Sequence, residues 1–267
     1  HRERPLSMEL LEEMDLSKSM AVYRDRFADA GDFTFFFVGN FTLGGIEPLV
    51  RTYLGGLPST GREETWRDVG IEAPKGVVEK TVYRGIEPKS QTSLIFTGPF
   101  EYDGWRNNFE LDAMTSVLQI KLREGMREDL GGSYGVSVGS GVSHYPNEDY
   151  RITLRFGSDP KRTEELTRVV FEQIDSLRTF GTTEEYVTKV REMRKREREV
   201  ALKENGFWVG GLQMTHFNGI DPRLLMKYGD MVDSLTVEAV QAAARKYFDT
   251  ENYVHVTLLP EAAAGGE

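Results

Sequence analysis

The sequence predicts an α+β fold in which a layered, antiparallel-rich sheet carries helices packed on one face. Short segments rich in β-branched and aromatic residues indicate the strands, and in residues 150–156 apolar and polar side chains alternate with a period of two. Longer amphipathic segments indicate the helices. The 267 residues are 39% hydrophobic and 11% aromatic, which is enough to bury packed cores.

The two ends of the chain carry the same local pattern of helix, acidic connector and strand. Near the N-terminus, residues 20–27 predict a helix and residues 33–38 a buried strand. Near the C-terminus, residues 237–248 predict a helix and residues 253–259 a strand. We therefore expect the tail of one repeat unit followed by one complete unit.

This repeat divides the chain into four parts. Residues 1–57 form the tail of a preceding α/β unit, with a helix at 46–54. Residues 58–76, rich in glycine, proline and charge, are the expected linker. Residues 77–260 form the complete α+β unit, and 261–267 a disordered tail.

Within the complete unit, local patterns set the order of the elements. Leu111, Met114, Leu118 and Leu122 form one stripe on a helix over 108–127. Asp159 and Pro160 begin another helix, and Thr182-x-x-Glu185 is a capping box for the next. The predicted strands are 77–83, 92–97, 134–142, 150–156 and 253–259, and the predicted helices are 108–127, 160–180, 182–203, 207–217, 222–231 and 237–248.

Composition excludes several classes of function. The net charge of −10 disfavours nucleic acid and anionic lipid as partners. No apolar run approaches 18 residues, so we expect no membrane span. The absence of cysteine excludes disulfides, thiolate metal sites and a cysteine nucleophile. The polar residues 1–5 lack the apolar region of a signal peptide.

The sequence contains no local motif for a metal site or a nucleotide site. None of the four histidines, His1, His144, His216 and His255, has a second ligand three or four residues away, and His-x-x-Glu-His does not occur. We therefore expect neither zinc nor another cofactor in this chain. The glycine-rich run 131–141 does not fit a phosphate-binding loop. The charged run 189–198 has acidic residues at helical spacing, which is typical of a solvated, ion-paired face.

The segment 122–138 is the strongest candidate for a functional site. It ends a helix, turns at Gly131 and Gly132, and begins a strand, so it can present Arg127 and Tyr134 toward one space. A guanidinium and a phenol are suitable donors to peptide carbonyls or to a developing oxyanion. Spacing alone favours a simpler alternative, in which Arg127 complements the helix C-terminus and Tyr134 packs in the strand.

This segment resembles the arginine–tyrosine signature in the C-terminal half of zinc peptidases of the pitrilysin/insulinase family. The resemblance covers nearly the whole chain, because residues 32–40, 53–58 and 182–186 are similar to other parts of that half, in the same order. The missing His-x-x-Glu-His implies that the zinc half lies elsewhere.

The resemblance implies that the intact protein is a zinc-dependent endopeptidase. Zinc and a glutamate on the N-terminal half would activate water, and this chain alone would be inactive. Tyr134 and Arg127 would hold the peptide substrate and stabilise the tetrahedral intermediate. The expected partners are that N-terminal half and the peptide. The alternative is a non-catalytic scaffold or peptide-binding homologue. Periplasm and cytoplasm both remain open as compartments, with the periplasm slightly favoured by the resemblance.

Overall fold

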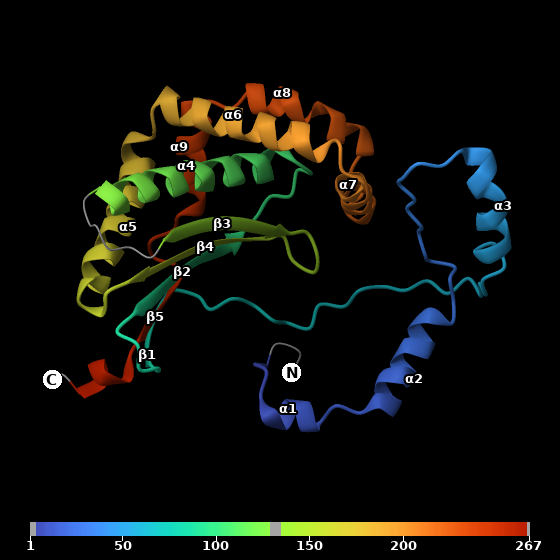
Figure 1. Ribbon diagram of the computed structural model, residues 1–267, viewed down its shortest axis with the longest axis horizontal. Coiled ribbons are helices and arrows are strands. Elements are labelled where there is room, and N and C mark those ends of the chain that lie inside the picture. Colours follow the sequence, from blue (N-terminus) through green and yellow to red (C-terminus); the bar gives the residue numbers. More distant parts are fainter. Residues whose placement is uncertain (1–3, 129–134, 266–267) are drawn as a thin grey trace. The chain divides into compact units, whose positions relative to one another are not determined.

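The computed structural model describes residues 4–128 and 135–265, and the chain forms two compact units, His1–Trp66 and Arg67–Glu267 (Figure 1). The division falls inside the segment 58–76, which contains no helix or strand.

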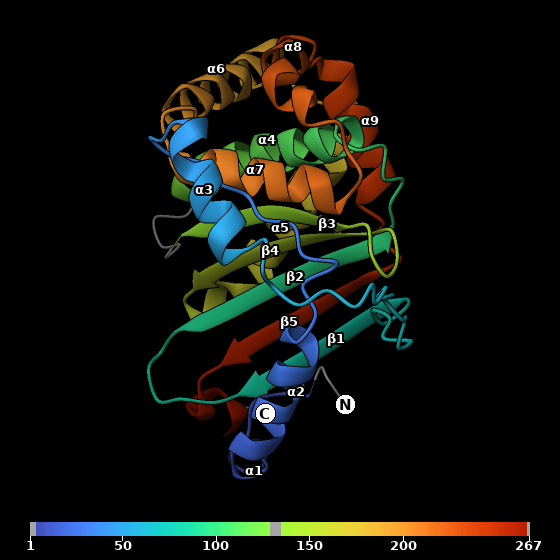
Figure 2. The ribbon, with the colours of Figure 1, turned by 90° about the vertical axis from the view of Figure 1, so that its right-hand side faces the viewer.

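The second unit is built on a five-stranded sheet of order β1-β5-β2-β4-β3 (Figure 2). Only β1 and β5 pair in parallel, and the other three pairings are antiparallel. This arrangement confirms the antiparallel-rich sheet. The strands are β1 (Val77–Tyr83), β2 (Ser90–Pro99), β3 (Val136–Ser143), β4 (Asp149–Ser158) and β5 (Tyr253–Leu259).

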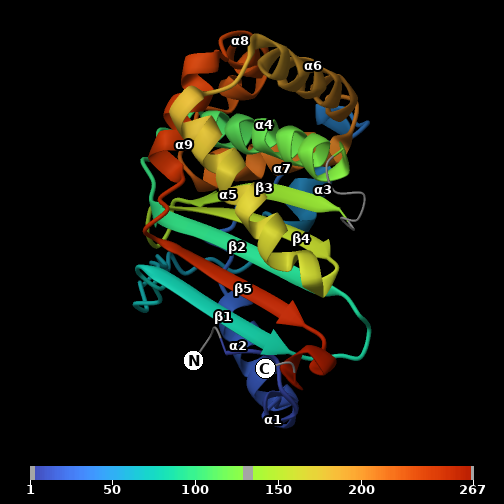
Figure 3. The ribbon, with the colours of Figure 1, turned by 90° about the vertical axis from the view of Figure 1, so that its left-hand side faces the viewer.

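The helices of the second unit lie on one face of this sheet (Figure 3). An inner layer of helices contacts the strands. The inner helices are α4 (Arg106–Glu128), α5 (Thr163–Phe180) and α9 (Val237–Tyr247). The outer elements are α6 (Glu184–Ala201), α7 (Asn205–Phe217), η2 (Pro222–Lys227) and α8 (Tyr228–Asp233), and the short turn η1 (Pro160–Arg162) precedes α5. In the outer layer, α6 packs on α4, α8 packs on α6, η2 packs on α8, and α7 packs on η2.

The core lies between the covered face of the sheet and the inner helices. The predicted stripe of α4 is confirmed, because all four of its apolar side chains are fully buried. The alternation in β4 is confirmed too: Ile152, Leu154 and Phe156 are buried, whereas Arg151 and Arg155 are exposed on the opposite face. We call this opposite side of the sheet the open face.

The start of α6 differs from the predicted capping box. The N-cap is Thr183, which makes no side-chain capping hydrogen bond, and the Thr182 hydroxyl is buried without a partner among the described residues. Gly181, with a φ of 77°, ends α5, and both threonines lie between it and the helix. Glu185 therefore occupies the second helical position rather than the third, where a capping box requires it.

The charged run on α6 is only partly a solvated face. Arg194 pairs with Asp112 of α4, and Arg191 and Arg198 donate to the main-chain carbonyls of Leu235 and Leu225. The solvated part of the prediction was wrong for these three arginines, because α4 and α8 pack against α6 and Arg198 reaches a carbonyl of η2. Arg191 and Arg194 are ion-paired as predicted, with Glu184 and Glu197 respectively.

The first unit contains α1 (Met8–Glu12), α2 (Leu16–Phe27) and α3 (Leu43–Tyr53). The buried strand predicted at residues 33–38 is not formed, and Phe35 and Phe37 are exposed. The apolar pattern is present, but no other strand occurs among the described residues of this unit to supply backbone hydrogen bonds.

A buried carboxylate, Asp29, organises part of the first unit. It accepts hydrogen bonds from the Thr60 hydroxyl and from the main-chain amides of Gly31 (2.8 Å), Thr60 (3.0 Å) and Arg62 (3.4 Å). The Thr60 hydroxyl first, and then these amides, lower the pKa of Asp29 to about 2.

The chain end also differs from expectation. We predicted a disordered tail after residue 260, but Glu261–Gly265 forms a short 3-10 helix, η3. Its first amide donates to the Gly85 carbonyl at 2.9 Å, which ties it to the end of β1.

Candidate substrate-binding site

The predicted pair lies at the connection between α4 and β3. Arg127 belongs to the last turn of α4, whose final residue is Glu128. Tyr134 belongs to residues 129–134, which lie outside the described residues. The structure therefore describes α4, the helix that contains Arg127, and β3, the strand that begins shortly after Tyr134.

The last turns of α4 are held by α6. The Tyr186 hydroxyl donates to Glu124 Oε2 at 2.6 Å, and the Lys189 ammonium lies 3.4 Å from Glu124 Oε1. The Tyr186 hydrogen bond is the main cause of a lowered pKa at Glu124, and the same bond raises the pKa of Tyr186. Glu124 precedes Arg127 by one helical turn, so this bond fixes the helix end that carries the arginine.

The beginning of β3 is held by α4. Gln119 Nε2 donates to the Val136 carbonyl at 2.8 Å, and the Val138 amide donates to Gln119 Oε1 at 2.5 Å. β3 is an edge strand, and one side-chain amide here replaces the two hydrogen bonds of a neighbouring strand. The chain enters β3 through Gly135, whose φ of 107° favours glycine.

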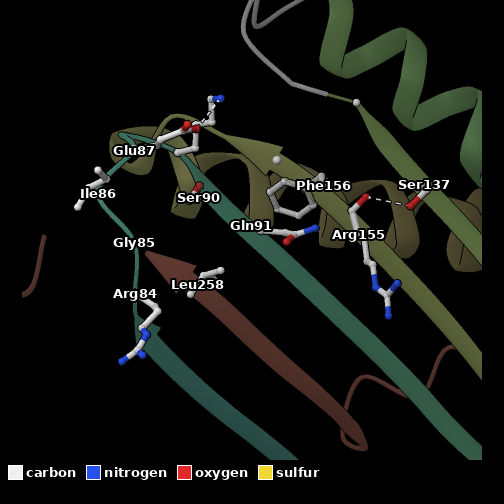
Figure 4. A pocket seen from close by; sticks show the side chains of 13 residues that line it. Arg84, Gly85, Ile86, Glu87, Ser90, Gln91, Ser137, Arg155, Phe156 and Leu258 are labelled. Carbon is white, nitrogen blue, oxygen red and sulfur yellow. Dashed lines mark hydrogen bonds and ion pairs between the residues drawn. The ribbon is translucent and has the colours of Figure 1, made fainter. Parts of the chain in front are cut away.

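A pocket of about 510 Å³ opens beside this entry (Figure 4). Its floor follows a row across the sheet, in which Leu258 pairs with Gln91, Gln91 with Gly157, and the Gly157 amide donates to Gly135 O at 3.4 Å. Gly157 of β4 and Gly135, which precedes β3, leave this end of the row without side chains. Figure 4 shows Gln91 and Leu258 between the side chains of Arg84 and Arg155.

The described residues do not fit a metal ion. Across residues 4–128 and 135–265, no group of three or more histidine, cysteine or acidic side chains could hold one. His144 stacks on Tyr102 with ring centroids 4.4 Å apart, and His255 lies 3.1 Å from the Thr257 hydroxyl. Both are therefore held by neighbouring side chains. In the same part of the chain, no helix combines the length and hydropathy that crossing a membrane would need.

Comparison with known protein families decides the identity of the fold. The family model described as the peptidase M16 inactive domain matches residues 17–194, which is most of the chain. This chain belongs to that family. Its relatives are named zinc proteases, which confirms the resemblance to the zinc peptidase family drawn from the arginine–tyrosine segment.

Relatives of the M16 chain are longer than it is. The zinc protease PQQL-like protein of Arabidopsis thaliana is 23% identical over 293 residues, covering 98% of this chain and 30% of the relative. The probable zinc protease PqqL of Haemophilus influenzae is 26% identical over 171 residues, or 62% of this chain and 18% of the relative. The chain thus spans less than a third of these curated relatives.

Solved structures share the M16 fold. The periplasmic protease PqqL from Escherichia coli has a TM-score of 0.82 at 22% identity, covering 97% of this chain and 29% of that one. A peptidase M16 inactive domain from Pseudomonas fluorescens has a TM-score of 0.69 at 19% identity, covering 95% and 60%. At these identities the likeness concerns the fold.

Sequence reasoning identified the connection between α4 and β3 but missed the residues around it. Gln119 gave a local signal, since it is an amide beside the buried stripe residue Leu118. The alternation in residues 150–156 predicts that Arg155 lies on the polar side of its strand. No local sequence signal indicates that it lies near Arg84. Their common pocket depends on the strand order, which is a tertiary property.

Proposed function

We propose that this chain is the substrate-binding, non-zinc part of a zinc-dependent endopeptidase. The observation that carries the proposal is the match of residues 17–194 to the M16 inactive domain, together with relatives named zinc proteases. The metal would belong to an N-terminal half that completes the enzyme, because the described residues offer no group of ligands for it.

The residues assigned to the substrate are Tyr134 and Arg127. The Tyr134 hydroxyl would donate a hydrogen bond to the oxyanion that develops when the peptide carbonyl is attacked. The Arg127 guanidinium would hold a carbonyl oxygen of the bound peptide. Support comes from the anchoring of both flanking elements: Glu124 fixes the end of α4, and Gln119 fixes the start of β3.

The test is peptide hydrolysis by the full-length protein. Tyr134→Phe removes one hydroxyl, and losing one oxyanion donor lowers kcat by about 10²–10³. Arg127→Ala should lower kcat/KM, with a larger share in KM, since a guanidinium also binds the ground-state carbonyl. The matched control is Tyr83→Phe, at an exposed tyrosine of β1 that does not line the pocket.

The readout is steady-state hydrolysis of a quenched fluorogenic peptide, with a thermal melt of each variant. Wild-type kinetics from both site variants would refute the assignment. The alternative is a non-catalytic peptide-binding or scaffold homologue. The sequence of the N-terminal half distinguishes it from the enzyme. An intact His-x-x-Glu-His there favours the enzyme, and its loss favours the homologue.

A further inference from the structure

We propose that the pocket between Arg84 and Arg155 binds a carboxylate group of the peptide, so that acidic peptide segments or peptide C-termini are preferred. This inference rests on the proposed function, because it concerns what a peptide presents to this half of the enzyme. It uses only described residues of the second unit.

The charge of Arg84 and Arg155 is not compensated by a carboxylate of the described residues. The chain has a net charge of −10, and several arginines on its helices have acidic partners: Arg106 lies 2.9 Å from Glu110, and Arg178 lies 3.1 Å from Asp175. Arg84 and Arg155 are exposed, and neither has a carboxylate partner within residues 4–128 and 135–265. Two cations left unpaired in an acidic protein are available to an anion from outside.

These cations lie close to a third basic residue, Lys80, on the open face of the sheet. Arg155 lies in a row across the sheet in which it pairs with Ser93, Ser93 with Val256, and Val256 with Lys80. Arg84 follows the last residue of β1, beside the neighbouring row that forms the pocket floor. Lys80 and Arg155 thus lie on one row, and Arg84 lies beside the next row, so three basic side chains produce a local positive potential.

The residues that line the pocket include one acidic side chain, Glu87. Its carboxylate lies 2.8 Å from the Lys89 ammonium, and this bond lowers its pKa. Glu87 is therefore engaged by a lysine of its own loop and does not neutralise the two arginines. The pocket retains a net positive charge from the side chains that line it.

The other groups that line the pocket also suit a carboxylate. Guanidinium groups bind carboxylates through paired N–H donors, and the Gln91 amide adds a neutral donor. The Ser137 hydroxyl donates to the Arg155 main-chain carbonyl at 3.5 Å (Figure 4). Leu258 supplies an apolar contact for the carbon atoms next to the carboxylate. The volume of about 510 Å³ exceeds that of one side chain, so a carboxylate can enter together with its backbone.

The experiment uses the full 267-residue chain, labelled with ¹⁵N, and three ten-residue peptides. The first peptide is neutral, acetylated and amidated. The second has the same sequence with a free C-terminal carboxylate, and the third is amidated with two central glutamines replaced by glutamates. Backbone amide shifts locate the binding site, and the titration gives the dissociation constant of each peptide.

The variants are Arg84→Gln and Arg155→Gln, singly and together. Arg151→Gln is the matched control, because Arg151 lies on the same strand and the same face as Arg155 but does not line the pocket. Thermal melts verify that every variant is folded. Since exposed ion pairs are modest in strength, each pocket variant should weaken carboxylate binding about three- to fivefold, and added salt should weaken it further.

Support requires that a carboxylate peptide shifts the amides of Gln91 and Ser137, and that Arg151→Gln changes its affinity by less than about twofold. Binding of the second peptide alone identifies a C-terminal carboxylate, and binding of the third alone identifies acidic side chains. Equal affinity for the neutral peptide, an equal effect of Arg151→Gln, or no shift at Gln91 and Ser137 would overturn the proposal.

The carboxylate-binding proposal can be refuted without refuting the proposed endopeptidase function. The hydrolysis assay with Tyr134→Phe can use a neutral, amidated substrate that presents no carboxylate. A large loss of kcat there, beside failure of the carboxylate titration, would leave the endopeptidase role intact and remove only the preference for acidic peptides.

Discussion

Replacing Arg194 with alanine would remove the ion pair that ties α6 to α4, the helix that carries Arg127. The Arg194 guanidinium contacts the Asp112 carboxylate and donates to the Ser116 hydroxyl at 2.8 Å. Desolvation raises the pKa of Asp112, and Arg194 opposes that rise through its charge and its hydrogen bond. The variant would leave a partly buried carboxylate without its cation.

The size of the effect follows from the exposure of the pair. Breaking a buried ion pair costs about 3–5 kcal/mol, whereas an exposed pair contributes about 0.2–1 kcal/mol. The Arg194 side chain is 18% exposed, but that of Asp112 is 42% exposed, so solvent screens the pair substantially. We therefore expect Arg194→Ala to lower the free energy of unfolding by about 2 kcal/mol at pH 7. For a unit of this size, Tm should fall by about 4–8 °C.

The effect should depend on pH. Because the folded-state pKa of Asp112 is raised, its contribution to stability falls as pH rises from the unfolded value through the folded value. Without Arg194 the folded-state pKa rises further, so this loss extends to higher pH. The stability difference between wild type and variant should be small in acid, where Asp112 is protonated, and should grow toward neutrality.

Urea denaturation of wild type, Arg194→Ala, Asp112→Asn and the double variant measures the coupling. We expect a coupling free energy of about 1 kcal/mol or more. The control is Arg168→Ala, whose partner Glu172 lies 3.7 Å away with both side chains mostly exposed, and whose effect should stay below about 0.5 kcal/mol. A pH-independent loss, or additive single effects, would refute the reasoning.

Three further predictions concern the ends of the proposed site and the first unit. Asp29→Asn should speed hydrogen exchange of the amides around Thr60, and unchanged exchange would contradict this. In the wild type, the protection of these amides should be present above pH 3.8 and lost as pH falls through about 2, because the folded-state pKa of Asp29 is depressed. Tyr186→Phe should bring the pKa of Glu124 back up toward its usual value, as followed by a carbon NMR titration, and an unmoved pKa would show that the hydrogen bond is not its cause. Limited proteolysis should cut first within residues 58–76 and leave the second unit folded, whereas earlier cleavage inside the second unit would contradict this boundary.

The sequence by itself determined the elements whose signal is local. The stripe of α4, the alternation of β4 and the helix end that carries Arg127 all follow from periodicity and backbone sterics within a few residues. Proteins of this family share an ordered set of such segments, so the resemblance could also be drawn from the chain alone. The segment that contains Tyr134 was found in this way, although that residue lies outside the described part of the chain.

Only the tertiary structure decided features that depend on a partner distant in sequence. Residues 33–38 carry the apolar pattern of a strand, but a strand needs a neighbour that local pattern cannot supply. The sequence pattern around Arg194 predicts a surface residue, but α4 packs beside it in the structure. Arg84, which follows β1, and Arg155 of β4 share a pocket because the sheet order places β5 and β2 between these two strands. Side-chain periodicity is set by neighbouring backbone atoms, whereas strand order and helix packing arise from the burial of apolar surface by the whole unit.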